Sequence, residues 1–472
     1  MTQAAESSFE QPTQPARAAQ PVAVKPVHSR LDSVIFYGIF GLLLFGPLAF
    51  GAVEPWSIFL LEGGTALLFM LWVVRQVQRG ELSIRGNPVF GPMAAFGVLI
   101  AVQLLFGLTA YRYVTASEAM LYTAYGMLSF LVVQNLRRTS QLKWLAVVLP
   151  AYGAAVALFA LVQALSGTTQ LYWTVTPRLG GWIYGPYVNH NHYAGLMEML
   201  VPIPLVLGLG HRRGTLKILA VAAAALMATT IFLSGSRGGM AAFIVELLVV
   251  AMIMAKRERH ARTIIAMAVF LTVVIGLLIW LGGGELVQRV TSIHTEARSE
   301  ISGGTRLAID RDALRMFTKK PVLGWGLGAF PEIYPQYRSF YTNFFVNEAH
   351  NDYLQLLVET GALGFAVMLW LIFVVYRSAL RKLTSWPGET NATLALAALL
   401  GVTGILVHSL VDFNLQIPAN AALFYVLCAV AASAPAFGQF QRRTRERVHD
   451  PLAAPPPKNV FQRLLERALG DT

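Results

Sequence analysis

The chain has 472 residues, of which 55% are hydrophobic and only 13% are charged. Soluble domains carry about 25% charged residues, so the composition excludes an ordinary soluble protein. The net charge of +12 does not indicate nucleic-acid binding, because the basic residues form short clusters beside apolar segments, where orientation in a bilayer explains them. The single cysteine, Cys428, lies in an apolar segment, which excludes a disulfide framework and a cysteine metal site.

Apolar segments long enough to cross a bilayer recur along most of the chain without a linker-like interruption. We therefore predict an all-α polytopic integral membrane protein with about twelve transmembrane helices. In chain order the predicted spans are Leu31–Ala52, Ser57–Val77, Pro88–Leu108, Ala116–Leu136, Lys143–Leu165, His190–Leu209, Thr215–Ser234, Gly238–Ala255, Thr263–Gly283, Gly361–Tyr376, Asn391–His408 and Leu415–Ala434.

Polar tails flank this membrane domain, which we place at residues 31–435. Residues 1–30 are rich in Gln, Ala and Pro and lack the apolar core of a signal peptide, so we expect a disordered cytoplasmic tail. Residues 436–472 are expected to form a basic cytoplasmic tail. Residues 284–360 form one connection, between the ninth and tenth spans, that is far longer than the others and is predicted to contain short helices.

Lysine and arginine fall almost entirely into the connections that follow even-numbered spans. The positive-inside rule then places these connections and both termini in the cytoplasm, and the long connection on the outer face. The short connections after odd-numbered spans hold only Arg112, Arg178 and Arg237. The basic residues of the even connections are Arg75, Arg79, Arg85, Arg137, Arg138, Lys143, Arg212, Arg213, Lys217, Lys256, Arg257, Arg259, Arg262, Arg377, Arg381 and Lys382.

Arg112 and Arg178, the first two arginines on the predicted outer face, have different neighbours and therefore different explanations. Arg112 lies in a Tyr-Arg-Tyr interfacial setting, where snorkelling to lipid phosphate explains it as well as a function does. Arg178 precedes a segment rich in Asn, His, Tyr and Gly that contains Asn191 and His192. Because a helix N-terminus presents free N–H groups, this segment is a candidate anion site. The alternative is an interfacial capping loop.

Arg237 lies in a Ser-Gly-Ser-Arg-Gly-Gly hairpin between two long apolar spans. A tight Ser/Gly turn is the expected connection between neighbouring transmembrane helices, so the arginine has a purely structural explanation. However, glycines on both sides allow a ligand to approach closely, and the hairpin contains no carboxylate. These features favour binding of a phosphate or carboxylate by Arg237.

The long connection is predicted to contain an amphipathic helix that starts near Thr305, ends before Pro321 and lies along the membrane interface. Its predicted apolar stripe consists of Leu307, Leu314 and Phe317. On its polar side, Arg311 and Arg315 share a face, with Arg306 one residue off that register. A solvated face is sufficient to explain Asp312, Lys319 and Lys320.

His350 follows in a Glu-Ala-His-Asn-Asp segment at the point where the tenth span is predicted to enter the membrane. Its neighbours Glu348 and Asp352 are expected to orient the imidazole or raise its pKa. Most lone histidines are structural. Here the same connection supplies several arginines and no serine or cysteine nucleophile motif, so histidine as general base and arginine as anion clamp is the simplest chemistry.

Two further groups of polar residues remain ambiguous. Asp412 and Asn414 lie in the hairpin between the last two spans, where bracing of the loops explains them as well as substrate contact does. Ionisable residues at membrane depth mark either a pathway or a packed polar pair; Glu198 is expected to support the Asn191 segment from about two turns below. These membrane-level acids are Glu62, Glu118, Glu198 and Glu246.

Six motifs follow one another between roughly residues 175 and 425, and all are predicted on the outer face. They are Asn-His-Asn-His-Tyr-Ala-Gly, Ser-Arg-Gly-Gly, Gly-Thr-Arg before an arginine-rich helix, Gly-Trp-Gly-Leu-Gly, which we expect to be a flexible turn, His-Asn-Asp-Tyr-Leu-Gln, and His-Ser-Leu-Val-Asp-Phe-Asn-Leu-Gln. In order and spacing, these motifs resemble the O-antigen ligase/polymerase superfamily of bacterial envelope proteins.

The resemblance implies a glycosyltransferase of the bacterial inner membrane, with a GT-C-like architecture, no metal or other cofactor, and a periplasmic active site. It implies an inverting transfer of a glycan from undecaprenyl diphosphate to a sugar hydroxyl of lipid A–core, which completes lipopolysaccharide. The implied partners are the lipid-linked donor, the lipid A–core acceptor and membrane lipids, without nucleic acid.

Carried over by motif, the resemblance makes His350 the catalytic base and makes Arg237 and Arg306 ligands of the diphosphate. Asp310 stands before Arg311, where the family pattern has an aromatic residue, so the role of Arg311 is less well defined. The further candidates for binding the diphosphate or glycan are Arg178, Asn191, His192, Arg311 and Arg315.

Two alternatives stay open at this point. Within the superfamily, a polymerase would extend the glycan on its carrier rather than transfer it to lipid A–core. Outside it, a secondary transporter of a small anion would also use arginines in a membrane domain, but such proteins favour internal repeats and sites near the midplane. The sequence contains no clear repeat, and a purely structural scaffold leaves the outer arginines without a role.

Overall fold

The computed structural model describes residues 30–80, 82–136, 138–177, 181–210, 214–255, 265, 267–281, 303–342, 345–383 and 390–433. Within these ranges the regular elements are helices, together with two isolated β-bridges. The two predicted tails lie outside the described residues except for Arg30, which begins the first helix.

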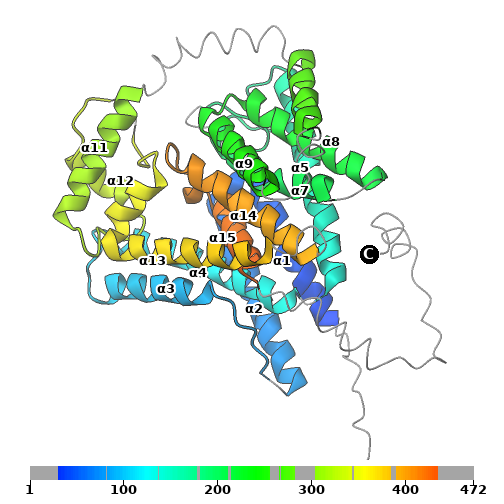
Figure 1. Ribbon diagram of the computed structural model, residues 1–472. Helices are drawn as coiled ribbons and strands as arrows, with labels where there is room; N and C mark the ends of the chain where they lie inside the picture. Colours follow the sequence, from blue (N-terminus) through cyan, green and yellow to red (C-terminus); the bar gives the residue numbers. More distant parts are fainter. Residues whose placement is uncertain are drawn as a thin grey trace, which may run out of the picture.

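Long apolar helices make up most of the structure (Figure 1). Three 3₁₀ turns, Phe50–Ala52, Tyr334–Gln336 and Asn414–Gln416, lie between them. The helices are α1 Arg30–Leu48, α2 Pro55–Arg79, α3 Phe90–Leu105, α4 Arg112–Asn135, α5 Thr139–Leu165, α6 His190–Leu200, α7 Pro202–Gly210, α8 Thr215–Ser234, α9 Arg237–Ala255, Met267–Leu281, α11 Gly303–Lys319, α12 Phe330–Ile333, α13 Asp352–Lys382, α14 Thr390–His408 and α15 Pro418–Ala432.

Each predicted span overlaps one of these helices. In the described part of the chain, eight helices are long and apolar enough to cross a membrane, and three further apolar helices are shorter. The protein is therefore a polytopic helical membrane protein, and the number of crossings stays a prediction. The sixth span is broken between α6 and α7 at Pro202, because proline lacks the N–H that would continue the helix.

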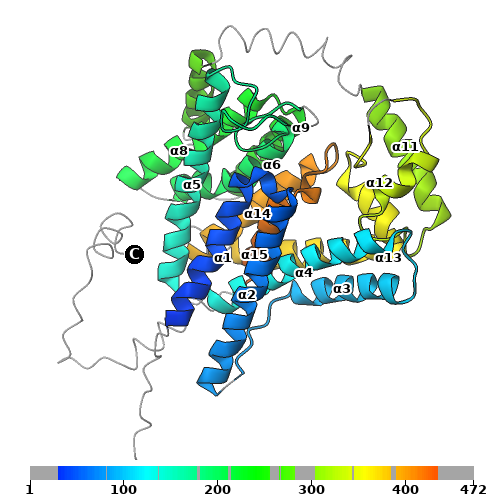
Figure 2. The ribbon, with the colours of Figure 1, turned by 180° about the vertical axis from the view of Figure 1, so that it is seen from behind.

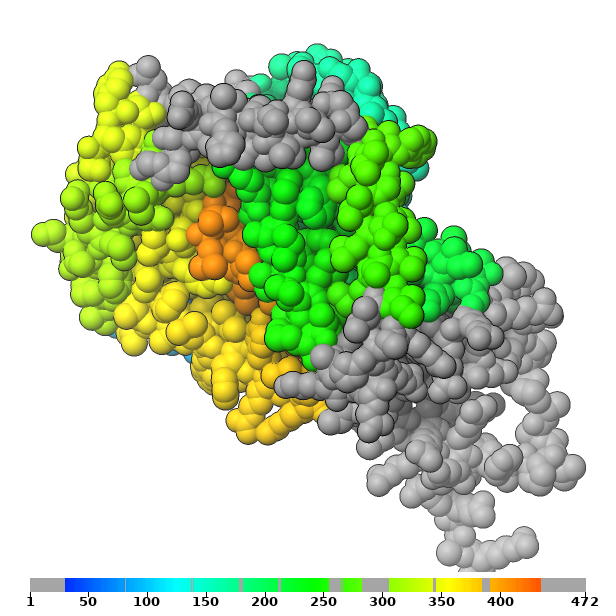
Figure 3. Space-filling model, turned by 45° about the horizontal axis from the view of Figure 1, so that its top comes forward, coloured from blue at the N-terminus to red at the C-terminus, as the bar shows by residue number. Residues whose placement is uncertain are grey.

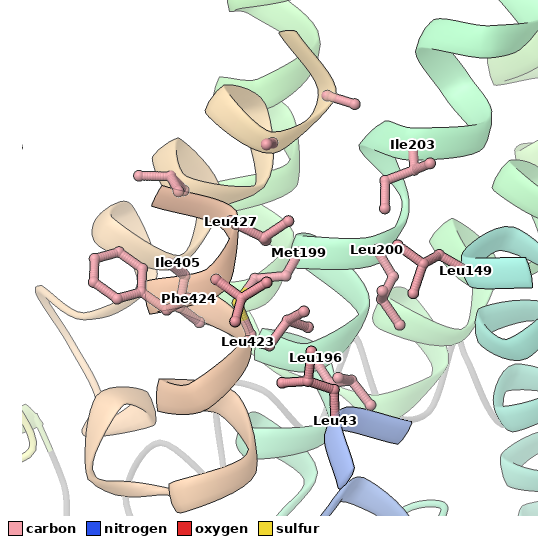
Figure 4. Close-up of a cluster of buried hydrophobic side chains, with 14 of the residues drawn as sticks. Leu43, Leu149, Leu196, Met199, Leu200, Ile203, Ile405, Leu423, Phe424 and Leu427 are labelled. Atoms are coloured by element: carbon pink, nitrogen blue, oxygen red, sulfur yellow. The ribbon is translucent and has the colours of Figure 1, made fainter. Parts of the chain in front are cut away.

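Helices α14 and α15 lie at the centre of the bundle, between α1 and α2 on one side and α9 on the other (Figures 1 and 2). In α14 and in α6–α7, 83% of the apolar stretch that could span a membrane is buried inside the protein. In α2 the corresponding share is only 28%. Leucines of α1, α6 and α15 interdigitate in this core (Figure 4). Since lipid is as apolar as leucine, close packing rather than burial from water stabilises these contacts.

Small residues allow the central helices to approach closely. A Cβ added to Gly401 of α14 would lie 2.8 Å from the backbone oxygen of Met199 in α6. Only glycine fits at such a backbone contact. The central pair is thereby held against α6, whose first turn contains two of the candidate site residues, Asn191 and His192.

Helices α11 and α12 form a separate unit at one end of the bundle, which we call the loop unit (residues 303–342; Figure 1). Its small core contains Ile309, Ala313 and Met316 of α11, with Phe330 and Tyr334 packed against them. The predicted apolar stripe of α11 was therefore wrong in part, because Leu307 and Leu314 are 49% and 47% exposed. The buried face lies two residues further along the helix.

Asp312 was expected on a solvated face, and this prediction is also wrong. Its side chain is fully buried and accepts hydrogen bonds from Ser339 N at 2.8 Å, Ser339 Oγ at 3.0 Å and Tyr334 Oη at 3.4 Å. Arg315 also donates to it, at 3.3 Å. The aspartate thus joins α11 to the segment that follows α12, and a buried carboxylate requires such partners.

Helix α13 is bent sharply at Gly361, where φ is 66° and ψ is −171°. The predicted tenth span started at this glycine, whereas the helix begins nine residues earlier. The loop unit fills the break: Ala362 N donates to Pro321 O at 2.8 Å, and Trp325 N donates to Val358 O at 2.9 Å. The broken helix therefore has partners for its freed backbone groups.

The Gly-Trp-Gly-Leu-Gly motif forms the other side of this junction and is closely packed rather than flexible, contrary to our expectation. All three of its glycines have positive φ, between 69° and 111°. A Cβ on Gly324 would collide with the backbone of Glu359, and one on Gly326 with the side chain of Thr109. The motif is thus explained by backbone geometry and not by phosphate binding.

Candidate functional site

The connection between α14 and α15 (residues 409–417, hereafter the α14–α15 hairpin) is fastened to the start of α13 by Asp352. The buried Asp352 carboxylate accepts hydrogen bonds from Ser409 Oγ at 2.7 Å, Leu415 N at 3.1 Å and Gln416 Nε2 at 3.3 Å. Its N–H donates to Ser409 O at 3.0 Å. This carboxylate binds the hairpin. It does not orient the ring of His350, and our expectation that it would is wrong.

His350 immediately precedes the capping residue of α13. Asn351 caps the helix by accepting from Tyr353 N and Leu354 N at 3.1 and 3.2 Å, and Ala349 N donates to Gln355 Oε1 at 3.0 Å. Between these fixed neighbours, His350 has a φ of 53°. A non-glycine residue in the left-handed region is uncommon, and such strain gathers at functional sites.

Asp412 lies between two imidazoles. Its Oδ1 is 3.9 Å from His350 Nδ1 and 3.9 Å from His192 Nε2, and Oδ1 also accepts from Phe413 N at 2.8 Å. The Phe413 ring meets both imidazoles edge-on, at 4.9 and 4.7 Å between centroids. The hairpin thus brings together His350 and His192, which are far apart in the sequence.

Burial and charge act in opposite directions on these groups. Burial lowers the pKa of His350 below its ordinary value of 6.5, and Arg306 lowers it further, whereas Asp412 raises it. The expectation that neighbouring carboxylates raise this pKa overall is therefore wrong. Burial alone would raise the pKa of Asp412, but the neighbouring imidazoles and Arg306 together keep it below its ordinary value. At neutral pH, the pair is a neutral imidazole beside a carboxylate.

Arg306 and the turn that contains Arg237 both reach Val411, the hairpin residue next to Asp412. Arg306, in the first turn of α11, donates to Val411 O at 2.9 Å. Arg237 is exposed and begins α9, and the adjacent Gly238 packs so closely that an added Cβ would lie 3.0 Å from the Val411 side chain. The loop unit and the Ser-Arg-Gly-Gly turn therefore converge on this hairpin, which Figure 3 shows at the surface between them.

A buried chain of hydrogen bonds supports the turn that carries Arg237. His408 Nδ1 lies 2.9 Å from Glu198 Oε1, and His408 Nε2 lies 3.4 Å from Ser236 Oγ. Although Ser, His and Glu in this order resemble a hydrolase triad, Ser236 is fully buried and accepts from Gly239 N at 3.1 Å, so it is a helix cap. Glu198 thus supports the Arg237 turn, not the Asn191 segment.

The Asn191 segment is built as a helix cap in part. Asn189, not Asn191, caps α6 by accepting from Asn191 N at 2.8 Å. His190 stacks on Trp182 with 4.4 Å between ring centroids and contacts Ser234 O through Nδ1 at 2.9 Å. Asn191 is half-buried, so a role in substrate binding stays a prediction. Arg178 lies outside the described residues.

Arg311 and Arg315 are not brought to the His350 centre. Arg311 is exposed on α11, and the Arg315 side chain is 66% exposed and paired with Asp312. Of the membrane-level acids, Glu246 is fully buried, and neither of its carboxylate oxygens has a hydrogen-bond partner among the described residues. In that same part of the chain, no three His, Cys, Asp or Glu side chains are arranged to hold a metal ion.

Sequence reasoning undervalued two aspartates. Asp412 was considered no more than an equal candidate for bracing, and Asp352 was considered only as a neighbour of His350. One signal was available for Asp412: it is an acid in a hairpin that contains no lysine or arginine, so a basic partner has to come from another segment. Nothing local in the sequence indicates that this partner is His350 together with His192.

A comparison with known protein families supports the motif-based resemblance. A family model described as O-antigen ligase matches residues 222–369. The matched segment includes Arg237, Arg306 and His350, and it ends before the α14–α15 hairpin. No curated protein matches the chain.

Proposed function

We propose that this chain, in which residues 222–369 match a family model described as O-antigen ligase, is a lipid-linked glycan ligase. In this proposal it transfers a glycan from undecaprenyl diphosphate to a hydroxyl of lipid A–core at the periplasmic face. The observation that carries the proposal is the convergence of His350, Asp412 and Arg306 on one hairpin. An imidazole base next to a carboxylate and a guanidinium suits alcohol activation opposite an anionic leaving group.

The proton transfer follows from the geometry of the His350–Asp412 pair. With Nδ1 protonated and facing Asp412 at 3.9 Å, His350 has a lone pair at Nε2 that can accept the proton of the acceptor hydroxyl. The developing imidazolium charge is then stabilised by the carboxylate, as in other base–acid pairs. The distance is long for a hydrogen bond, as is common in enzymes without substrate.

The leaving group determines the role of the arginines. As the acceptor oxygen bonds to the anomeric carbon, the bond from that carbon to the diphosphate oxygen breaks, and undecaprenyl diphosphate leaves with the electron pair. Arg306 of α11 and Arg237 of α9 would neutralise this charge and form directed hydrogen bonds to phosphate oxygens. Attack from the side opposite the diphosphate inverts the anomeric centre.

The carrier also needs an apolar site within the membrane. An apolar pocket of about 500 Å³ lies between α3, α4 and α13, and Tyr122 and Tyr425 contribute to its walls. Leu327 of the Gly-Trp-Gly-Leu-Gly motif packs against Phe96 and Ile100 at its edge. We propose that this pocket receives part of a lipid chain. The excess of Lys and Arg at the opposite ends of the helices supports a periplasmic position for His350.

Purified protein in liposomes tests this proposal directly. It is supplied with lipid-linked glycan and either lipid A–core or a second lipid-linked unit, with and without chelator. The ligase proposal predicts transfer to lipid A–core, unchanged by chelator, and loss of transfer in His350→Ala with unchanged yield of folded protein. Product only on the second lipid-linked unit would identify a polymerase, and uptake of a small anion without any sugar product would identify a transporter.

A further inference from the structure

A second pocket adjoins the candidate base on the side of α11. It has a volume of about 140 Å³ and lies between the first turns of α11 and residues 340–342 and 345–350, with His350 and Phe413 in its wall. Since a water molecule occupies about 30 Å³ in the liquid, the pocket has room for several water molecules and can receive one ring of the size of a sugar. Any group bound here lies next to the imidazole.

The wall of this pocket combines aromatic rings with small polar groups. Phe340, Phe345 and Phe413 supply the rings, and Asn347 supplies an amide. Phe345 is 71% exposed, so its ring is available for contact with a bound group. A sugar ring has one apolar C–H face and a rim of hydroxyls, so it matches aromatic faces together with amide, hydroxyl and carboxyl groups.

The described wall of this pocket contains no positively charged side chain, unlike the neighbouring region around Arg306. Neither lysine nor arginine is among the described residues that line it. Thr305 lines the pocket, whereas Arg306, its neighbour in α11, donates to the carbonyl oxygen of Val411. A diphosphate placed in this pocket would be desolvated without a counter-charge, which is strongly unfavourable. The phosphates therefore belong on the arginine side of His350, and an uncharged group belongs here.

Among the described residues, Glu348 supplies the one carboxyl group in the wall. It accepts a hydrogen bond from Gln355 Nε2, and Gln355 also donates to Glu359 at 3.3 Å. Burial raises the pKa of Glu348 well above its ordinary value, which favours the uncharged carboxyl over the carboxylate. A protonated carboxyl both donates and accepts hydrogen bonds, which suits sugar hydroxyls.

We propose that this pocket, which we call the acceptor pocket, binds the terminal sugar ring of the acceptor in an uncharged, unphosphorylated form and presents one hydroxyl to His350. The proposal rests on the glycosyltransferase function proposed above and adds the position and the charge class of the acceptor ring. The donor diphosphate then approaches from the Arg306 side, so that the two substrates meet at the imidazole from different directions.

Initial-rate kinetics with the full-length protein in liposomes tests this inference. Phe345→Ala and Asn347→Ala are expected to raise the KM for lipid A–core about tenfold, the range for loss of one binding contact, with the KM for the lipid-linked donor unchanged. Tyr341→Ala is the matched control: Tyr341 is 86% exposed near Phe345 and is not among the pocket residues. An increase in donor KM, or no change in either KM, would overturn the inference.

A second comparison tests the charge class. An acceptor with a phosphate on its terminal sugar should have a kcat/KM at least about tenfold lower than the same acceptor without it. Asn347→Lys adds a positive charge to the pocket and should reduce this difference in kcat/KM between the two acceptors. Equal use of both acceptors by the wild-type protein contradicts the proposal. If the proposed function itself were wrong, the wild-type protein would form no product on either acceptor. That result is distinct from the outcomes that contradict the pocket proposal.

Discussion

The charges of Asp412 and Arg306 shift the pKa of His350 in opposite directions. The pH dependence of the reaction should report both effects. Because burial and Arg306 lower its pKa, the acid limb of kcat/KM should have its midpoint below 6.5, with full activity at neutral pH. A midpoint above 7 would indicate a different base. The kcat/KM profile is the appropriate measurement, since it reports the pKa of the free enzyme.

Single substitutions at the two charged neighbours should move this midpoint in opposite directions. Asp412→Asn removes a charge that favours the imidazolium, so the midpoint falls, while the amide keeps an acceptor for Phe413 N. Arg306→Gln removes a charge that disfavours it, so the midpoint rises. Shifts in the same direction, or none, would show that neither group acts on the base.

Of the arginines predicted from the sequence to bind the diphosphate or glycan, the four that the structure describes (Arg237, Arg306, Arg311 and Arg315) are not equivalent. Arg237→Lys should raise the donor KM, because a lysine cannot reproduce the two parallel hydrogen bonds of a guanidinium to phosphate. Arg311→Lys, on the exposed side of α11, serves as the control and should leave the donor KM unchanged. If the two variants were affected equally, the assignment of the diphosphate to the Val411 side would be wrong.

At the scale of elements, the break in α13 at Gly361 determines how the loop unit is attached. A side chain at this position is doubly unfavourable, because φ is 66° and a Cβ would collide with the carbonyl group of Val322. Gly361→Ala should therefore destabilise the protein by about 1–3 kcal/mol and reduce transfer, by displacing the loop unit from the hairpin.

Thermal unfolding in detergent measures this effect. Gly63→Ala in α2 is the control, since an added Cβ there meets nothing within 4 Å and alanine is the better helix former. It should leave stability unchanged or slightly increased. A Gly361→Ala protein as stable as the Gly63→Ala protein would show that the backbone contacts between residues 321–326 and α13 do not hold the loop unit.

The elements also show why sequence reasoning succeeded for the spans and failed for parts of the loop unit. Membrane spans are long and uniformly apolar, so length and composition locate most of them within a few residues. The tenth is the exception, since its helix begins nine residues before the predicted start. In α11, three apolar residues suggested a stripe, but the buried face is determined by contacts with Phe330 and Tyr334. Likewise, Asp312 is buried because Ser339 and Tyr334 reach it, and neither partner is adjacent to it in the sequence.

The same reasoning applies to the candidate site. Arg237, Arg306 and His350 were identified from motifs, because each motif is local. Their arrangement around Asp412 depends on the way Asp352 fastens the α14–α15 hairpin to α13, a contact across about sixty residues of chain. Long-range contacts of this kind leave no local pattern, so the centre of the site could not be predicted from the sequence.

For the whole molecule, the proposed lipid-binding site is the pocket between α3, α4 and α13. Gly97 and Gly126 lie in its wall with open space around the position of an added Cβ. Gly97→Leu and Gly126→Leu should fill the pocket without disturbing the backbone and raise the donor KM. Gly63→Leu, which does not line the pocket, is the matched control. An unchanged donor KM in all three variants would place the lipid chain elsewhere.

The central claim is that guanidinium groups and the His350 imidazole meet around one donor diphosphate. A structure of the protein in lipid nanodiscs with an unreactive lipid-linked diphosphate bound is the most direct measurement. The account predicts phosphate oxygens within hydrogen-bond distance of Arg237 and Arg306, with the anomeric carbon facing His350. A diphosphate bound at Arg311 and Arg315, or remote from His350, would contradict it.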